Sequence, residues 1–133
     1  MIKPENRFIN LLHMKLDSSI YHMKTNNPYT SGEPDVYYES SGDILWVEYK
    51  WVPTLWTKSI AAQDICKTKS WIAQQQWLDR AVKNGKQAYV IVGIGSGRST
   101  CAYVLRHPYN FDPALNPIHT VQRVADWILR KTT

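Results

Sequence analysis

Apolar residues recur every three to four positions in three stretches of the chain, which is the spacing of an amphipathic helix. The first helix is expected to begin at Pro4, a residue that suits an opening position, and to run to about Ser18. A second helix is expected over residues 71–82, with Ser70 as its N-cap, and a closing helix over residues 118–131. The inward residues are Phe8, Ile9, Leu12 and Leu16 in the first helix and Val121, Val124, Ala125, Ile128 and Leu129 in the last.

Shorter runs rich in aromatic and β-branched residues lie between these helices and predict strands. The runs cover residues 36–38, 44–51, 88–94 and 100–105. A turn at residues 40–43, Ser-Ser-Gly-Asp, folds the first of these strands back against the second. The third run is continuously apolar, which is typical of a buried strand.

The strand at residues 44–51 carries an acid and a base among apolar residues. Side chains on a strand alternate between its two faces, so Glu48 and Lys50 project from the same face. That face also carries Ile44 and Trp46, and the other face carries Leu45, Val47, Tyr49 and Trp51. Asp35 can approach Glu48 across the hairpin. Two carboxylates held together are costly unless a cation or a shared proton neutralises them, and a hard divalent metal ion is the usual solution.

These residues resemble the two motifs of the PD-(D/E)XK nuclease superfamily. Pro34-Asp35 matches the first motif, and Glu48-Tyr49-Lys50 matches the second. Taken singly, a Glu-x-Lys triplet is often a solvated salt bridge and a Pro-Asp pair an ordinary turn. The joint pattern of helix, Pro-Asp strand, turn, Glu-x-Lys strand and glutamine-rich helix favours the nuclease interpretation.

The resemblance implies an α/β fold with a restriction-endonuclease-like αβββαβ core. A mixed central sheet flanked by helices would be followed by a C-terminal helix, all in a single domain spanning residues 1–133. The αβββαβ order requires one more strand than the apolar runs predict. We expect it within residues 20–31, which otherwise read as a loop or a ragged extended segment, or within residues 51–56.

The activity implied by the resemblance is metal-dependent hydrolysis of phosphodiester bonds in DNA. Asp35, Glu48 and the carbonyl of Tyr49 would hold one or two Mg²⁺ or Mn²⁺ ions, which polarise the phosphate and lower the pKa of a bound water. Lys50 would orient that water or offset charge in the transition state. The alternative for Lys50 is simple ion pairing with Glu48.

Two further residues enter the site through the resemblance. Many members of the superfamily carry a glutamate on the first helix that reaches the metal, which here would be Glu5; the alternative is a first-turn acid that favours the helix dipole. Virus-type and phage nucleases of this superfamily carry a glutamine on the second helix next to the lysine. Gln74 matches that position best, with Gln75 as the second choice. Gln74 falls on the apolar face of the second helix, and a buried glutamine there needs hydrogen-bond partners.

The charge of the chain favours a polyanionic partner. Sixteen Lys and Arg against 11 Asp and Glu give a formal net charge of +5. The candidates for nucleic-acid contact are Trp56, Lys58, Lys67, Lys69 and Arg98, with another cationic group at Arg123, Arg130 and Lys131. An ordinary basic surface is the alternative. Tryptophans can also pack under a loop, which we expect for Trp51 and leave open for Trp56.

Other patterns exclude competing classes. Apolar runs are too short to span a membrane, and the first residues lack the layout of a signal peptide, so an intracellular, cytoplasmic protein is expected. The only two cysteines and four scattered histidines form no zinc pattern. The glycine-rich stretch at residues 93–97 is expected to be a hairpin turn and no phosphate loop, because Arg98 occupies the place of the third glycine.

The sequence leaves the substrate open. A short chain without a separate recognition domain favours structure-selective or nonspecific DNA cleavage, with a phage-type junction or flap nuclease as the preferred version and a homodimer as a possible assembly. A non-catalytic nucleic-acid-binding module of the same fold is the main alternative, and a protein-interaction domain is another.

Overall fold

The computed structural model describes residues 2–25, 32–53, 69–111 and 116–133. The strands are β1 (Tyr21–Lys24), β2 (Val36–Glu39), β3 (Leu45–Val52), β4 (Gln87–Ile94), β5 (Cys101–Arg106) and β6 (His119–Thr120). The helices are α1 (Pro4–Met14), α3 (Lys69–Lys83) and α4 (Val121–Thr132), with a short 3-10 turn at Gly97–Ser99.

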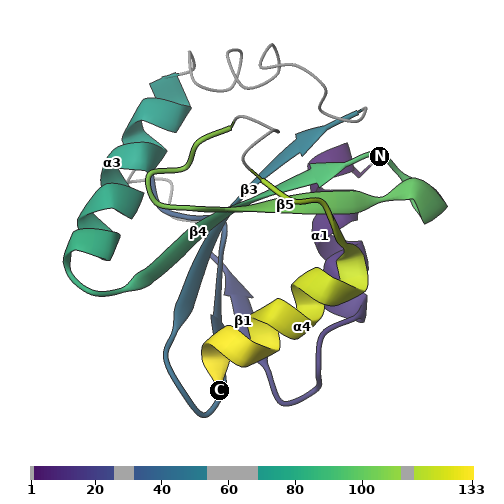
Figure 1. Ribbon diagram of the computed structural model, residues 1–133, viewed down its shortest axis with the longest axis horizontal. Coiled ribbons are helices and arrows are strands. Elements are labelled where there is room, and N and C mark those ends of the chain that lie inside the picture. The colour runs from purple at the N-terminus through teal and green to yellow at the C-terminus, as the bar shows by residue number, and fades with distance from the viewer. Residues whose placement is uncertain (1, 26–31, 54–68, 112–115) are drawn as a thin grey trace.

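The strands form one mixed six-stranded sheet in the order β1-β2-β3-β4-β5-β6 (Figure 1). The pair β3 and β4 is parallel, and every other neighbouring pair is antiparallel. Parallel neighbours need a crossover connection, and here the connection includes α3. The mixed sheet flanked by helices that the sequence predicts is therefore confirmed.

Helices cover both faces of the sheet. On one face, apolar residues of α1 and α4 pack with Val47 and Tyr49 of β3, whereas on the other face α3 packs with residues of β4 and β5 (Figure 1). Trp46 contacts the α3 side, and the Lys50 amine reaches a side chain of α3. The predicted alternation along β3 is thus confirmed, and Glu48 shares the α3 side with Lys50.

Helix α1 packs against the sheet at Gly93 of β4. A Cβ atom built on Gly93 would lie 2.5 Å from Cγ of Phe8, so the Phe8 ring occupies the space that a side chain at this position would need. The same ring meets Tyr49 edge-on at 6.1 Å between centroids. This contact seats the first turn of α1 against the middle of the sheet.

Several boundaries differ from those expected. Helix α1 ends at Met14 rather than Ser18, because the N–H groups of Lys15 and Leu16 donate to carbonyls only three residues back and tighten the chain out of the helix. The missing strand of the meander is β1, within the segment expected to be a loop or extended. The closing helix begins at Val121, three residues after residue 118, since His119–Thr120 pairs with β5 and Thr120 caps the helix. The other expected elements lie within two residues of their predicted ends.

Within the described ranges, no helix has both the length and the apolar character needed to cross a membrane.

Candidate active site

Asp35 is fixed where the pairing of β2 with β3 stops. The last paired residues are Val36 and Val47, and one step farther the carboxylate of Asp35 accepts a hydrogen bond from the backbone N–H of Tyr49 at 2.8 Å. The carbonyl of Asp35 accepts the backbone N–H of Thr25 at 2.9 Å, which holds the segment from the other side. The Asp35 side chain thus takes the place of a backbone carbonyl of a neighbouring strand, and its carboxylate lies directly beside the backbone of β3.

Glu48 is a buried acid with an unpaired oxygen. Its side chain is 2% exposed, Oε2 lies 3.3 Å from Nζ of Lys50, and Oε1 has no hydrogen-bond partner among the described residues. Burial and the charge of Asp35 raise the pKa of this carboxyl to about 9, although Lys50 acts in the opposite direction. Among the described residues, Lys50 is the cation that contacts this carboxyl, and its charge does not offset burial and the charge of Asp35.

Lys50 is held by α3. Its Nζ donates to Oε1 of Gln74 at 2.7 Å and lies 5.7 Å from the ring centroid of Trp71, one helical turn earlier. Of the two glutamines considered from the sequence, Gln74 is the one that contacts Lys50. An amide oxygen, a carboxylate and an aromatic ring therefore fix the position of one ammonium group.

Glu5 faces the same constellation from α1. Burial raises the pKa of its carboxyl and the charge of Asp35 raises it further, while Lys50 and Lys24 act to lower it. Glu5 therefore lies within electrostatic range of both Asp35 and Lys50. Its role as a metal ligand stays a prediction beside the first-turn effect on the helix dipole.

The candidates for nucleic-acid contact are placed less completely. Trp56, Lys58 and Lys67 lie outside the described residues, and Lys69 is the first residue of α3. Arg98 is exposed in the turn between β4 and β5, which is a hairpin as expected. Trp51 packs as expected, against the α1 side of the sheet, with its Nε1 donating to the carbonyl of Gly95 at 3.0 Å.

Two features escaped the sequence interpretation. Trp71 was not named as a site residue, and its spacing of three residues from Gln74 was the available sign that both reach Lys50. On the opposite side of β3, the Tyr49 hydroxyl is hydrogen-bonded to that of Tyr38, which contacts His13 Nε2 at 2.7 Å. This chain of polar groups joins α1 to the strand that carries the site.

The donor set suits a hard divalent cation. Among the described residues, no three His, Cys, Asp or Glu side chains already converge as a ligand group. The carboxylates of Asp35, just before β2, and of Glu48 on β3 are nevertheless adjacent, and one buried oxygen of Glu48 has no hydrogen-bond partner in the described parts of the chain. Carboxylate and carbonyl oxygens are the ligands that Mg²⁺ and Mn²⁺ prefer. The residues present therefore fit such an ion.

Comparison of the whole chain with solved structures identifies its fold. The structure is similar to that of Hjc, a Holliday junction resolvase from the hyperthermophilic archaeon Archaeoglobus fulgidus, with a TM-score of 0.54 and 16% sequence identity, covering 90% of this chain and 98% of Hjc. The fold is restriction-endonuclease-like. It has the mixed sheet, flanking helices and C-terminal helix that the sequence predicts. No family model and no curated protein matches the sequence.

Proposed function

We propose that this chain is a metal-dependent nuclease of the PD-(D/E)XK type that hydrolyses phosphodiester bonds in DNA. The observation that carries the proposal is the buried Glu48 beside Lys50 and Asp35, one of whose carboxylate oxygens has no hydrogen-bond partner among the residues that the structure describes. A structural domain would gain nothing from such a group, because burying a charge without full compensation costs stability. The fold of a Holliday junction resolvase supports the same function.

Asp35, Glu48 and the carbonyl of Tyr49 would hold one or two Mg²⁺ or Mn²⁺ ions, with Glu5 contributing from α1. A metal ion bound there would polarise the scissile phosphate and lower the pKa of a bound water. The remaining work falls to the chain itself. Asp35 is oriented by the N–H of Tyr49, which donates a hydrogen bond to its Oδ2 atom.

Lys50 presents a fixed positive charge to the scissile phosphate or to the attacking water. Because Gln74 and Glu48 both contact its amine, Lys50 needs little reorganisation when negative charge develops. Gln74 is a positioning residue in this scheme, since it acts through Lys50.

The substrate we favour is branched DNA, such as a four-way junction or a flap. The likeness to Hjc supports this choice, and a homodimer would place two sites on two strands. A phage-type role in recombination, repair or replication is part of this proposal.

The test is cleavage of linear, nicked, single-stranded, flapped and four-way DNA with Mg²⁺, Mn²⁺ or EDTA. Asp35→Asn and Glu48→Gln should each abolish metal-dependent cleavage while the fold survives, since each removes a ligand charge. Asp43→Asn, at an exposed residue of the β2–β3 turn, is the matched control and should keep wild-type activity. Cleavage that persists in either well-folded site variant would reject the assignment, and DNA binding without any cleavage would favour the non-catalytic module.

Lys50→Ala separates catalysis from charge compensation. If the amine acts in the transition state, single-turnover cleavage at saturating Mg²⁺ should fall by about 100-fold, with metal and DNA affinity within a few-fold of wild type. A near-normal rate combined with a lower melting temperature would make Lys50 a counter-ion of Glu48.

A further inference from the structure

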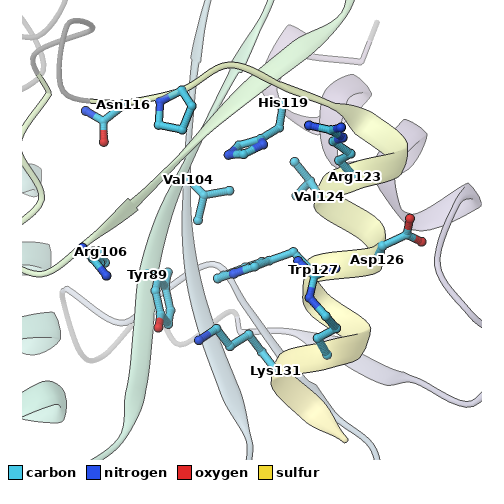
Figure 2. A pocket seen from close by; sticks show the side chains of 12 residues that line it. Tyr89, Val104, Arg106, Asn116, His119, Arg123, Val124, Asp126, Trp127 and Lys131 are labelled. Atoms are coloured by element: carbon cyan, nitrogen blue, oxygen red, sulfur yellow. The ribbon is translucent and has the colours of Figure 1, made fainter.

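A cavity lies across the sheet from the candidate active site. It has a volume of about 720 Å³ and is enclosed by α4, by the outer part of the sheet and by the segment at residues 116–119 (Figure 2). Strand β6 pairs with only two residues of β5, so the edge of β5 from Tyr103 onward has no strand partner in the described parts of the chain. The cavity occupies the space between this edge and α4. Its size is typical of sites that hold a small ligand.

Aromatic rings form the floor of this cavity. Tyr89 of β4 and Arg106 of β5 are direct partners in the antiparallel pairing, so both project from the α4 face. Trp127 of α4 reaches across to Tyr89, and the two rings meet edge-on at 4.8 Å between centroids (Figure 2). Trp127 is only half-buried, which leaves part of its ring open to the cavity.

Cationic side chains surround these rings. Arg106, Arg123, Arg130 and Lys131 line the cavity against a single carboxylate, Asp126, which leaves a net charge of +3 when His119 is neutral. The Asp126 carboxylate already accepts a hydrogen bond from Gln122 at 3.0 Å.

None of these four cations forms an ion pair within the described residues. The Lys131 amine lies over the Tyr89 ring, at 5.5 Å from its centroid. His119 is affected by the same positive charge. Burial lowers the pKa of its imidazole, and the charges of Arg123 and Arg130 lower it further. The cavity therefore concentrates positive charge that no ion pair within the described ranges neutralises.

We propose that this cavity binds a nucleotide unit, with its phosphate against Arg123 and Arg130 and its base against Trp127. Guanidinium groups match phosphate geometry, and an aromatic ring provides a stacking platform for any base. The unit comes either from a single-stranded segment of nucleic acid or from a free nucleotide. The site does not depend on cleavage at Glu48, because it lies on the opposite face of the sheet.

The test is an NMR titration of the ¹⁵N-labelled full chain in EDTA, following the indole signal of Trp127, which is assigned with Trp127→Phe. The probes are tetrathymidylate, thymidine monophosphate, thymidine, inorganic phosphate and an oligoglutamate. Tetrathymidylate or the monophosphate should move this signal, with thymidine and phosphate each binding about tenfold more weakly or worse, since each supplies only one half of the recognised unit. If thymidine monophosphate and tetrathymidylate bind with equal affinity per site, the natural ligand is a free nucleotide. If tetrathymidylate binds more tightly, the natural ligand is a single strand.

Paired charge variants give the control. Arg123→Gln with Arg130→Gln should weaken tetrathymidylate binding by about tenfold or more, because both remove direct phosphate contacts. Both residues are exposed, so the fold should persist. Lys83→Gln with Lys86→Gln changes the net charge equally at the far end of α3 and should alter affinity by only about twofold. Equal losses in both double variants, or oligoglutamate binding as tightly as the nucleotides, would overturn the proposal.

Discussion

Replacing Glu48 with glutamine should stabilise the metal-free protein at alkaline pH, although it is expected to destroy the activity. The glutamine keeps an oxygen for the Lys50 amine and removes the ionisable proton. In the wild-type fold, the carboxyl is 2% exposed and its pKa is raised to about 9 from an ordinary value of 4.5. The unfolded chain releases this proton near its ordinary pKa, whereas the folded chain retains it.

The sign and size follow from linkage. A group with a raised pKa contributes stability that is complete below the unfolded pKa and is lost as the pH rises to the folded pKa. Each pH unit in that window costs at most about 1.4 kcal/mol, so three units, from about pH 5.5 to 8.5, cost up to about 4 kcal/mol. The Glu48→Gln variant has no ionisable group at this position, so its free energy of unfolding does not fall for this reason.

The measurement is urea unfolding of both proteins in EDTA at several pH values, followed by tryptophan fluorescence. All other titrating groups are shared, so the difference between the two free energies of unfolding isolates Glu48. We expect the difference to move in favour of the variant as the pH rises. Parallel curves would show that the carboxyl titrates normally and would refute the argument. Adding Mg²⁺ should restore stability to the wild type at about pH 8.5 and leave the variant unchanged.

Gln74→Ala should lower the single-turnover rate by about tenfold, because it frees the amine of Lys50, whereas Gln75→Ala should have little effect; equal rates for the two variants would remove Gln74 from the site. Acid should also destabilise the fold through His13, because burial lowers the pKa of its imidazole to about 4. The stability it contributes is present above about pH 6.5 and is lost as the pH falls to about 4, by about 1–2 kcal/mol after allowance for its partial exposure. In His13→Gln, where the glutamine can still bond to Tyr38, the fall in the free energy of unfolding over that window should be smaller than in the wild type, and parallel curves would contradict this.

The central strand could be read from the sequence because its chemistry is local. Alternation along a strand is fixed by backbone geometry, so the shared face of Glu48 and Lys50 followed from their spacing of two. Helical spacing placed the amide of Gln74 among apolar residues, and the resemblance to virus-type and phage nucleases implied its place next to Lys50. The roles of these residues in catalysis stay predictions.

Features that depend on distant contacts were harder to predict. All four residues of β1 are exposed, so no burial pattern marks the strand, and its backbone is held by pairing with β2. The end of α1 at Met14 carries no glycine or proline. The cavity beneath α4 gathers side chains from three strands and a helix, and only the fold brings these together.

The absence of a side chain at Gly93 sets the distance between two layers of the molecule. Any residue larger than glycine at this position would push the Phe8 ring, and with it the first turn of α1, away from the sheet. The Glu5 carboxylate would then withdraw from Asp35. If Glu5 is a metal ligand as proposed, the size of the residue at position 93 therefore controls whether its carboxylate stays within reach of Asp35.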